Sequence, residues 1–403
     1  MSNSNEHFQF TDERFADLQM LRYRLNGFED LTLSQQIYIY CLAKATLMGR
    51  DITFDQQGKY NLRIRKTLEA IYKHYDGDRT SDDFKALEVY LKRVWFSSGI
   101  YHHYGCEKFK PGFSEHFFYE AVSLMPETEL PLRRGETKED LLDELVPVIF
   151  DEEVLPKRVN QTDGVDLVAT SACNFYEDVT QDEVERFYAR LKDGKDLTPP
   201  SYGLNSKLMK RNGEIVEKTW KEEGMYGSAI KEIISWLLKA QKYTENEQQA
   251  HVIDLLIKYY RTGDLSDFDR YSIAWVKQQE GMVDFINGFI EVYGDPLGLK
   301  GTWEGLVEFK DMEATRRTQA ISQNAQWFED HSPVAPQFKK AEVKGVTAHV
   351  ICAAMLGGDE YPASAIGINL PNANWIRETH GSKSVTIGNL TEAYNKAAHG
   401  NGF

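Results

Sequence analysis

The residues around Asn212-Gly213 limit most strongly what this chain can fold into. In the segment KLMKRNGEIVEK, residues 207–218, this pair stands between two short runs in which apolar and polar residues alternate. An Asn-Gly pair in such a setting is the strongest short-range signal for a β-hairpin with a two-residue turn. The chain is therefore expected to contain a sheet, although most of the residues before the pair are typical of helices.

Helical spacing dominates the part of the chain before the hairpin. Ser81, for example, is a good N-cap for a helix with a continuous apolar face. A cluster of Gly, Pro and charged residues, KDGKDLTPPSYG at 192–203, then interrupts the pattern. Because 403 residues are many for a single core, we expect a helix-rich region over residues 1–195 and a mixed α/β region over residues 196–403.

Three more helices are expected after the hairpin. The first has an apolar stripe over residues 230–238. The second is expected to begin at a capping box formed by Thr244 and Glu247 and to end at Gly263. The third is expected to begin at a Ser266 cap.

Strands are expected in the last part of the chain. The segments GFIEVYG at 288–294, GLVEF at 305–309 and VTAHVICAAML at 346–356 are short and apolar. Between the last two, residues 313–328 are typical of one helix. The sequence therefore predicts an α+β fold in which helices are in the majority and the sheet is small.

Composition excludes several classes of partner. The formal net charge of −15, without a basic stripe, argues against nucleic acid. No run of 18 apolar residues and no secretory signal at residues 1–10 is present, which argues against a membrane. No CxxC pair occurs, so a reducing, cytoplasmic setting with free thiols is expected. The four cysteines are Cys41, Cys106, Cys173 and Cys352.

The ten histidines and the glycines exclude several common catalytic motifs. A zinc-binding HExxH helix needs Glu directly after His, and no His in the sequence has one. No GxSxG, GxxxxGK[ST] or GxGxxG segment occurs either. A metal site built wholly within this chain is therefore not expected.

A set of hydrogen-bond acceptors remains as a candidate site. Glu291 lies among apolar residues of an expected strand, two residues before Tyr293, so both side chains are expected on one face. The later segment IGINLPN presents Gly367, Asn369 and Asn372. One carboxylate and two amide oxygens suit a cationic amine, and the glycine would admit an extended peptide at a strand edge. The alternatives are a solvated strand face and an Asn-Pro turn.

Two segments that contain these residues resemble the dipeptidyl peptidase III family, zinc-dependent exopeptidases that remove dipeptides from peptide N-termini. The segment GFIEVYGDPLGLKGTWEG, residues 288–305, keeps the pattern GFIExYxDPxGxxGxxEG. The segment GINLPNANWIRETHGSKSVTIGN, residues 367–389, keeps GIN-x-PN. A weaker match covers residues 99–113. The resemblance implies the substrate lobe of a two-lobed peptidase, with a five-stranded, mostly antiparallel, barrel-like sheet.

The resemblance also implies a role for each candidate residue. Glu291, Asn369 and Asn372 would bind the α-ammonium group of the peptide, and Tyr293 would stabilise the oxyanion at the scissile carbonyl. Gly367 would pair with the peptide main chain. In the weaker segment, the aromatic residue that would line a subsite is Tyr104.

The zinc motifs of the family, HExxGH and EExxA[ED], would follow the GIN-x-PN segment, and the chain ends at Phe403 without them. We therefore expect a fragment that binds short peptides with a free N-terminus, lacks its zinc-binding C-terminal part and is inactive alone. Zn²⁺ would be the cofactor of the complete enzyme, with none bound here. Two alternatives are a non-enzymatic peptide binder and an enzyme that uses paired carboxylates, such as Glu291 and Glu304.

Overall fold

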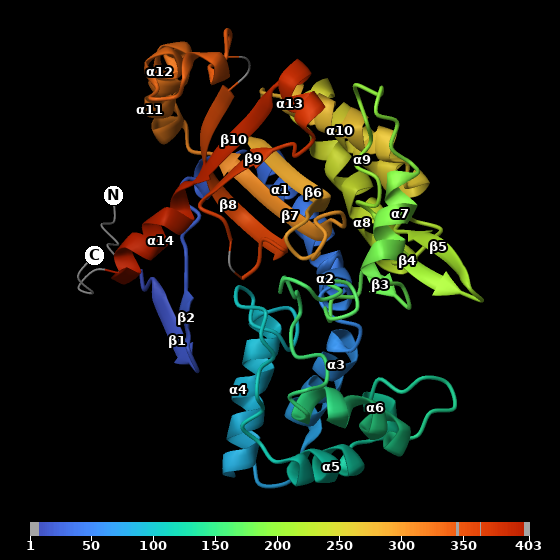
Figure 1. Cartoon of the computed structure of the whole chain (residues 1–403). Helices are drawn as coiled ribbons and strands as arrows, with labels where there is room; N and C mark the ends of the chain where they lie inside the picture. The colour runs from blue at the N-terminus through green and yellow to red at the C-terminus, as the bar shows by residue number, and fades with distance from the viewer. Residues whose placement is uncertain (1–7, 344–345, 363, 399–403) are drawn as a thin grey trace.

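The fold is centred on one five-stranded sheet, as the computed structural model shows (Figure 1). The structure describes residues 8–343, 346–362 and 364–398, so most of the segment 1–10 lies outside the described residues. The strand order is β6-β7-β8-β10-β9, and all neighbours are antiparallel except β8 and β10. The strands are β6 (Val283–Glu291), β7 (Thr302–Lys310), β8 (Val346–Gly358), β9 (Gly367–Leu370) and β10 (Ser382–Ile387).

This sheet is curled but open. β6 and β9 are its two edge strands, so the expected barrel is not closed. Lys383 on β10 nevertheless reaches across to β6, where its Nζ lies 2.6 Å from Asp284 Oδ2. Contact between the second-last strand and the opposite edge requires strong curvature, which brings the two edges toward each other.

Helices cover the sheet and form a second lobe. α1 (Leu33–Met48) packs on β6, β7 and β8 and on α8 (Gly227–Ala240), which leads to α9 (Glu247–Thr262) and α10 (Leu265–Lys277). The second lobe lies at the bottom of Figure 1 and has a hydrophobic core of its own. Its helices are α3 (Asn61–His74), α4 (Asp82–Phe96), α5 (Glu115–Leu124) and α6 (Lys138–Phe150).

The two hydrophobic cores do not divide the chain at a single residue. α1 belongs to the core of the sheet, whereas most of the second core comes from residues 54–149. α2 (Arg50–Gln56) connects the two lobes, and α7 (Gln181–Ala189) follows the second. Residues 192–203 lie between α7 and the hairpin. The division at residues 195 and 196 stays a prediction.

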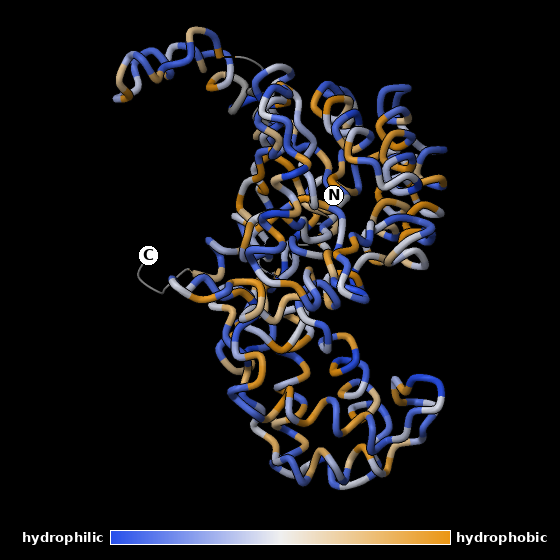
Figure 2. Tube along the Cα trace, turned by 45° about the vertical axis from the view of Figure 1, so that its right-hand side comes forward, coloured by the Kyte–Doolittle hydropathy of each residue, from blue (hydrophilic) through white to orange (hydrophobic). Residues whose placement is uncertain are grey.

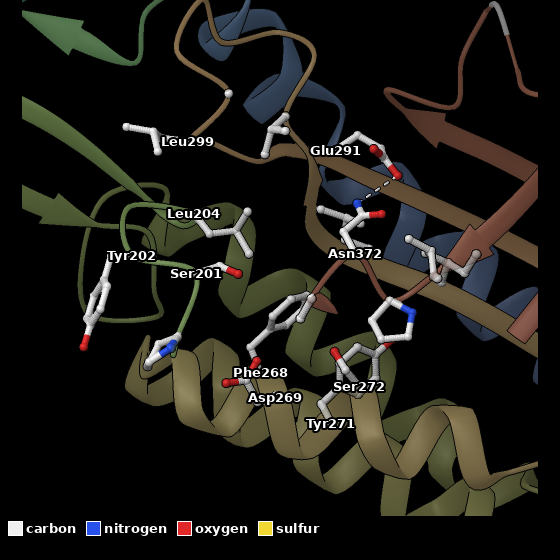
Figure 3. A pocket seen from close by; sticks show the side chains of 18 of the residues that line it. Ser201, Tyr202, Leu204, Phe268, Asp269, Tyr271, Ser272, Glu291, Leu299 and Asn372 are labelled. Carbon is white, nitrogen blue, oxygen red and sulfur yellow. Dashed lines mark hydrogen bonds between the residues drawn. The ribbon is translucent and has the colours of Figure 1, made fainter. Parts of the chain in front are cut away.

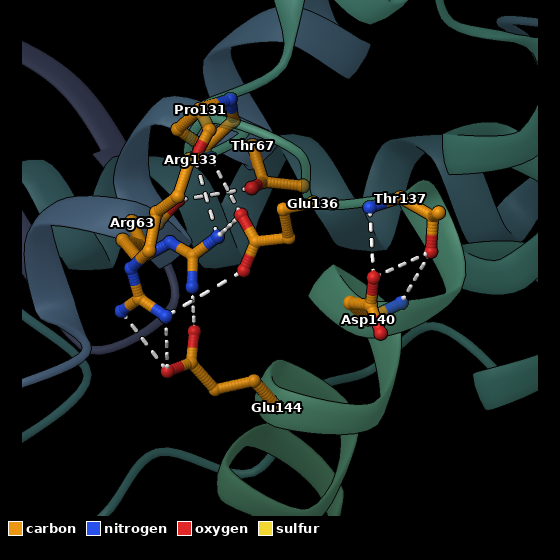
Figure 4. A network of polar contacts seen from close by, with 8 residues as sticks. All are labelled: Arg63, Thr67, Pro131, Arg133, Glu136, Thr137, Asp140 and Glu144. Atoms are coloured by element: carbon orange, nitrogen blue, oxygen red, sulfur yellow. Dashed lines mark hydrogen bonds and ion pairs between the residues drawn. The ribbon is translucent and has the colours of Figure 1, made fainter.

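Polar contacts hold the loop before α6 against α3. Arg63 donates to the Pro131 carbonyl and pairs with Glu136 and Glu144, and Arg133 also contacts both carboxylates (Figure 4). The helix itself begins at a capping box of Thr137 and Asp140. Hydrophilic and hydrophobic residues alternate along the helices of this lobe in Figure 2, the pattern expected of helices that bury one face.

The expected hairpin is confirmed. β4 (Ser206–Arg211) pairs with β5 (Glu214–Thr219) around Asn212 and Gly213, which have φ angles of 52° and 82°. Positive φ at both central positions is the requirement of a type I′ turn. The remaining strands are β1 (Thr11–Phe15), β2 (Leu18–Leu21) and β3 (Tyr176–Glu177), which pairs with β4.

Several element boundaries differ from the expectations. The N-cap of α9 is Asn246 and not Thr244: the helix begins at Glu247, and Asn246 Oδ1 accepts from the main-chain N–H of Gln249 over 2.9 Å. The N-cap of α10 is Asp264 and not Ser266. The single helix expected over residues 313–328 is broken in two. Its parts are α11 (Met312–Gln323) and α12 (Ala325–His331), while α13 (Asn374–His380) and α14 (Gly388–Ala398) complete the fold.

α12 exposes large apolar side chains. Trp327 and Phe328 are 55% and 50% exposed, and the pair α11–α12 projects from the sheet (Figure 1). Among the described residues, no helix has the length and apolar character needed to cross a membrane.

Candidate functional site

Glu291 and Asn372 meet where the two edges of the curled sheet approach each other. Glu291 is the last residue of β6, and Asn372 follows β9. Asn372 Nδ2 donates a hydrogen bond to Glu291 Oε1 over 3.2 Å (Figure 3). The structure thus brings together two candidate residues that are 81 positions apart.

A cavity of about 400 Å³ opens beside this contact. Its far wall comes from α10, where Phe268 and Tyr271 face the site (Figure 3). Trp275 of the same helix also lines the cavity. The Trp275 indole donates to the Phe285 carbonyl over 2.9 Å, which fixes the ring against β6. The cavity therefore combines a polar rim that carries Glu291 with an apolar interior.

Tyr293 lies beyond the end of β6. The strand expected to include it ends two residues earlier, and the register shifts between Phe289 and Glu291. Tyr293 is consequently not held on the sheet face, and it is 81% exposed. It lines both the cavity beside Glu291 and a second cavity of about 760 Å³, which Tyr104 lines as well.

The turn that carries Tyr293 is organised by the buried carboxylate of Asp295. This side chain accepts hydrogen bonds from the main-chain N–H groups of Leu299 and Lys300 over 2.7 and 2.9 Å, and from the Tyr176 hydroxyl over 2.9 Å. Leu297 N donates to it over 3.2 Å. The loop after β6, residues 295–300, is therefore held by main-chain hydrogen bonds to the single carboxylate of Asp295.

Gly367 and Asn369 lie on β9, at the edge of the sheet, and do not line the cavity beside Glu291. The main-chain N–H of Ile387 donates to the Ile366 carbonyl, so Ile366 and Ile387 form a hydrogen-bonded pair that continues the β9–β10 ladder. Since bonded and non-bonded pairs alternate in an antiparallel ladder, the main-chain groups of Gly367 and Asn369 point away from β10. They face the open side of the sheet.

Two buried carboxyl groups, Glu304 and Glu360, and the half-buried Asp359 lie near Glu291. Burial, followed by repulsion from Glu360, Asp359 and Glu291, raises the pKa of Glu304 far above its ordinary value. Burial also raises the pKa of Glu360, against a hydrogen bond from Ser364. Burial, opposed by Arg158 and aided by Glu291, raises the pKa of Asp359 to about 6. The surroundings of Glu291 are thus strongly acidic once these groups ionise.

Sequence reasoning missed the α10 wall and two of these carboxyl groups. Phe268, Tyr271 and Trp275 have the spacing of an ordinary buried helix face, and nothing in that pattern indicates a ligand. The adjacent acids Asp359 and Glu360 directly follow a Gly-Gly pair, which is the signal that could have drawn attention to them. Glu304, the second member of the alternative carboxylate pair, is only 2% exposed, which argues against its contact with a substrate.

Comparison with known proteins identifies the class to which this site belongs. Residues 202–401 match the family model described as peptidase family M49. The chain belongs to this family of peptidases, and the resemblance to the dipeptidyl peptidase III family is confirmed.

The relatives that match along most of this chain carry the name dipeptidyl peptidase 3. The protein of Dictyostelium discoideum is 23% identical over 401 residues, which cover 92% of this chain and 55% of the relative. The human protein is 23% identical over 397 residues, 90% of this chain and 53% of the relative. A solved structure described as DPP III from Caldithrix abyssi has a TM-score of 0.65 at 19% identity and covers 91% of this chain and 57% of that chain.

This chain thus spans about half the length of the curated relatives it matches. The resemblance described above implies zinc as the cofactor of the complete enzyme. Among the described residues, no group of three or more His, Cys, Asp or Glu side chains is arranged to hold a metal ion. The described residues therefore do not fit a zinc site.

Proposed function

We propose that this chain binds the free N-terminus of a short peptide as the substrate-binding part of a dipeptidyl peptidase III-type enzyme, which removes dipeptides from peptide N-termini. The contact between Glu291 and Asn372 at the rim of the cavity carries the proposal. An α-ammonium group has three donors and one positive charge. It is matched by a carboxylate flanked by amide oxygens.

The observed hydrogen bond leaves the right atoms available for this role. Asn372 uses its NH₂ group toward Glu291, so its carbonyl oxygen can accept from the ammonium group. Asn369 would supply a second amide oxygen from β9. Asp359, whose raised pKa of about 6 still leaves it ionised at neutral pH, adds negative charge near Glu291, which favours a cation over a neutral ligand.

The peptide main chain would extend along β9. The outward main-chain groups of Gly367 and Asn369 are the groups that an added strand needs. Tyr293, which is exposed between the two cavities, would direct its phenol toward the scissile carbonyl. Tyr104 would line the neighbouring subsite in the second cavity.

A binding measurement with a fluorescent pentapeptide tests the amine contact. Substitution Glu291→Gln removes the charge and keeps the shape, so we expect affinity to fall at least about tenfold, since a charge-assisted hydrogen bond contributes roughly 1.5–3 kcal/mol. N-acetylation of the peptide is expected to weaken binding to the original chain by a similar factor. Acetylation should have little further effect on the Glu291→Gln variant.

The matched control is Glu139→Gln, because Glu139 is an exposed carboxylate on α6 in the other lobe. Its affinity for the peptide should equal that of the unsubstituted chain. Equal affinity of the Glu291→Gln variant and the unsubstituted chain would contradict the proposed amine contact.

The second candidate function is peptide binding without cleavage. It is favoured by the position of the amine-binding residues, all of which belong to this chain, while the printed sequence has no HExxH segment. In both cases the chain alone is expected not to release dipeptides from a dipeptidyl-arylamide, even with zinc added. Chelator-sensitive release would contradict this expectation. In an enzyme completed by its zinc-binding part, Tyr293→Phe should lower kcat far more than affinity.

A further inference from the structure

A separate cavity of about 590 Å³ lies where the helical lobe meets the sheet. α1, α2, α3, α4 and the end of β8 contribute to its wall, and it shares no lining residue with the cavity beside Glu291. Its volume falls within the range of ordinary small-molecule sites. It therefore has room for a ligand of its own.

The charge of this wall is opposite to that of the chain as a whole. Arg50, Arg65 and Lys73 line the cavity together with one carboxylate, Glu69. The chain carries a formal net charge of −15. A cationic cavity in an acidic protein favours an anionic occupant.

Arg65 is the buried centre of the wall, with its side chain 5% exposed. Its Nη2 donates to Asp51 Oδ1 over 2.9 Å, and its Nε lies 3.4 Å from Glu69 Oε1. Neither Nε nor Nη1 has a hydrogen-bond partner in the described part of the chain. An unmatched buried donor on a charged group is costly, so this guanidinium group has unused capacity for an acceptor.

A second unmatched group and an aromatic wall complete the cavity. The hydroxyl of Thr46, which is 1% exposed, also lacks a hydrogen-bond partner within the described chain. The guanidinium group of Arg65 lies 4.4 Å from the ring centroid of Phe54, and Trp95 and Leu356 extend the apolar surface. The wall is polar around Arg65 and Thr46 and apolar elsewhere.

We propose that this cavity binds a small organic carboxylic acid, with the carboxylate on Arg65 and an aromatic or aliphatic body against Phe54, Trp95 and Leu356. Arginine presents a planar fork that matches a carboxylate. Asp51 and Glu69, which already contact Arg65, would repel a dianion more strongly than a monoanion. This favours a carboxylate over a phosphate group.

Titration calorimetry on the complete 403-residue chain tests the proposal with 3-phenylpropionate, its neutral amide and inorganic phosphate. The acid is expected to bind with a Kd below about 1 mM, and the amide at least about tenfold more weakly. The fluorescence of Trp95, checked with a Trp95→Phe variant, should change on addition of the acid. Absence of acid binding, equal binding of acid and amide, or tighter binding of phosphate would overturn the proposal.

Substitutions locate the bound acid. Arg65→Gln should weaken its binding about tenfold or more, and Arg50→Gln, at a side chain that is 65% exposed, should weaken it severalfold without a folding defect. Arg134→Gln, on the exposed surface of the helical lobe, makes the same charge change and should have no effect. Glu291→Gln should also leave acid binding unchanged. Unchanged affinity in the Arg50→Gln variant and in a folded Arg65→Gln variant would place the acid elsewhere and overturn the proposal.

Discussion

Asp295 fixes the turn that carries Tyr293, although Asp295 itself does not line the cavity beside Glu291. Its carboxylate is 1% exposed and accepts from three main-chain N–H groups and from Tyr176. Those donors would otherwise be buried without partners. The turn after β6, which carries Tyr293, therefore depends on an acid two residues away.

Replacing Asp295 by Ala should destabilise the chain strongly. The substitution leaves several buried donors unmatched, and each costs roughly 1–3 kcal/mol, so we expect a loss of at least about 3 kcal/mol in the free energy of unfolding. Asp193→Ala, at an exposed carboxylate in the loop after α7, should cost less than about 0.5 kcal/mol. Urea denaturation measures both. Similar losses for the two variants would show that Asp295 does not organise the turn.

Part of the candidate site could be predicted from residue types alone. Glu291 and Asn372 are residue types that suit one ammonium group as acceptors, and the structure places them in contact. The position of Tyr293 was wrong in detail, because alternation along a strand does not reveal a register shift next to Glu291. The α10 wall could not be predicted, since it depends on how residues far apart in sequence pack.

At the scale of elements, the turn signal was reliable and the N-cap signals of α9 and α10 were not. The Asn212-Gly213 turn needs only its own backbone conformation, and the hairpin formed as expected. The cap of α9 was wrong because Thr244 and Asn246 are both good cap residues two positions apart, and a sequence pattern does not rank them; Asn246 is the one that accepts from the helix. The helix expected over residues 313–328 ended early at Asn324 for a similarly local reason, a C-cap that its apolar spacing did not show.

Two glycine substitutions, one in the hairpin turn and one outside it, test the left-handed backbone conformation of the turn. Gly213 has φ +82°, and a Cβ added there would meet nothing within 4 Å, so Gly213→Ala tests backbone strain alone. We expect it to lower the free energy of unfolding by about 1–2 kcal/mol. Gly194 is equally open but has no positive φ, so Gly194→Ala should be neutral or slightly stabilising. Equal effects in urea denaturation would contradict a left-handed conformation at Gly213.

For the whole molecule, the curvature of the sheet has an electrostatic consequence. Curling brings Asp284 of β6 to Lys383 of β10 and encloses Glu308 of β7, which is 2% exposed. One oxygen of Glu308 has no hydrogen-bond partner among the described residues. Burial, followed by repulsion from Asp284, raises the pKa of Glu308 above its ordinary value. The same topology that joins the two edges at Glu291 therefore buries a carboxyl group that resists ionisation.

Stability should consequently fall as pH rises above the ordinary range of a Glu side chain. A group whose pKa is raised in the folded state binds its proton more tightly there than in the unfolded chain, so its stabilising contribution is complete below the unfolded pKa of about 4.3 and is lost as pH rises through the folded pKa. Asp359, with a pKa of about 6, acts in the same direction. Thermal unfolding is therefore expected at a higher temperature at pH 6 than at pH 8.

Substitution Glu308→Gln isolates this contribution, because the amide cannot ionise. At pH 8 the variant should exceed the unsubstituted chain in free energy of unfolding by about 1–3 kcal/mol, the cost of an unmatched buried polar group. The gain should shrink toward pH 5, where Glu308 is protonated in the folded state and the pH is close to the unfolded pKa of about 4.3. Glu139→Gln, an exposed control, should show no such pH dependence. Denaturation in urea at both pH values measures the difference. A gain that is the same at pH 5 and pH 8 would mean that packing, and not ionisation, sets the stability at Glu308.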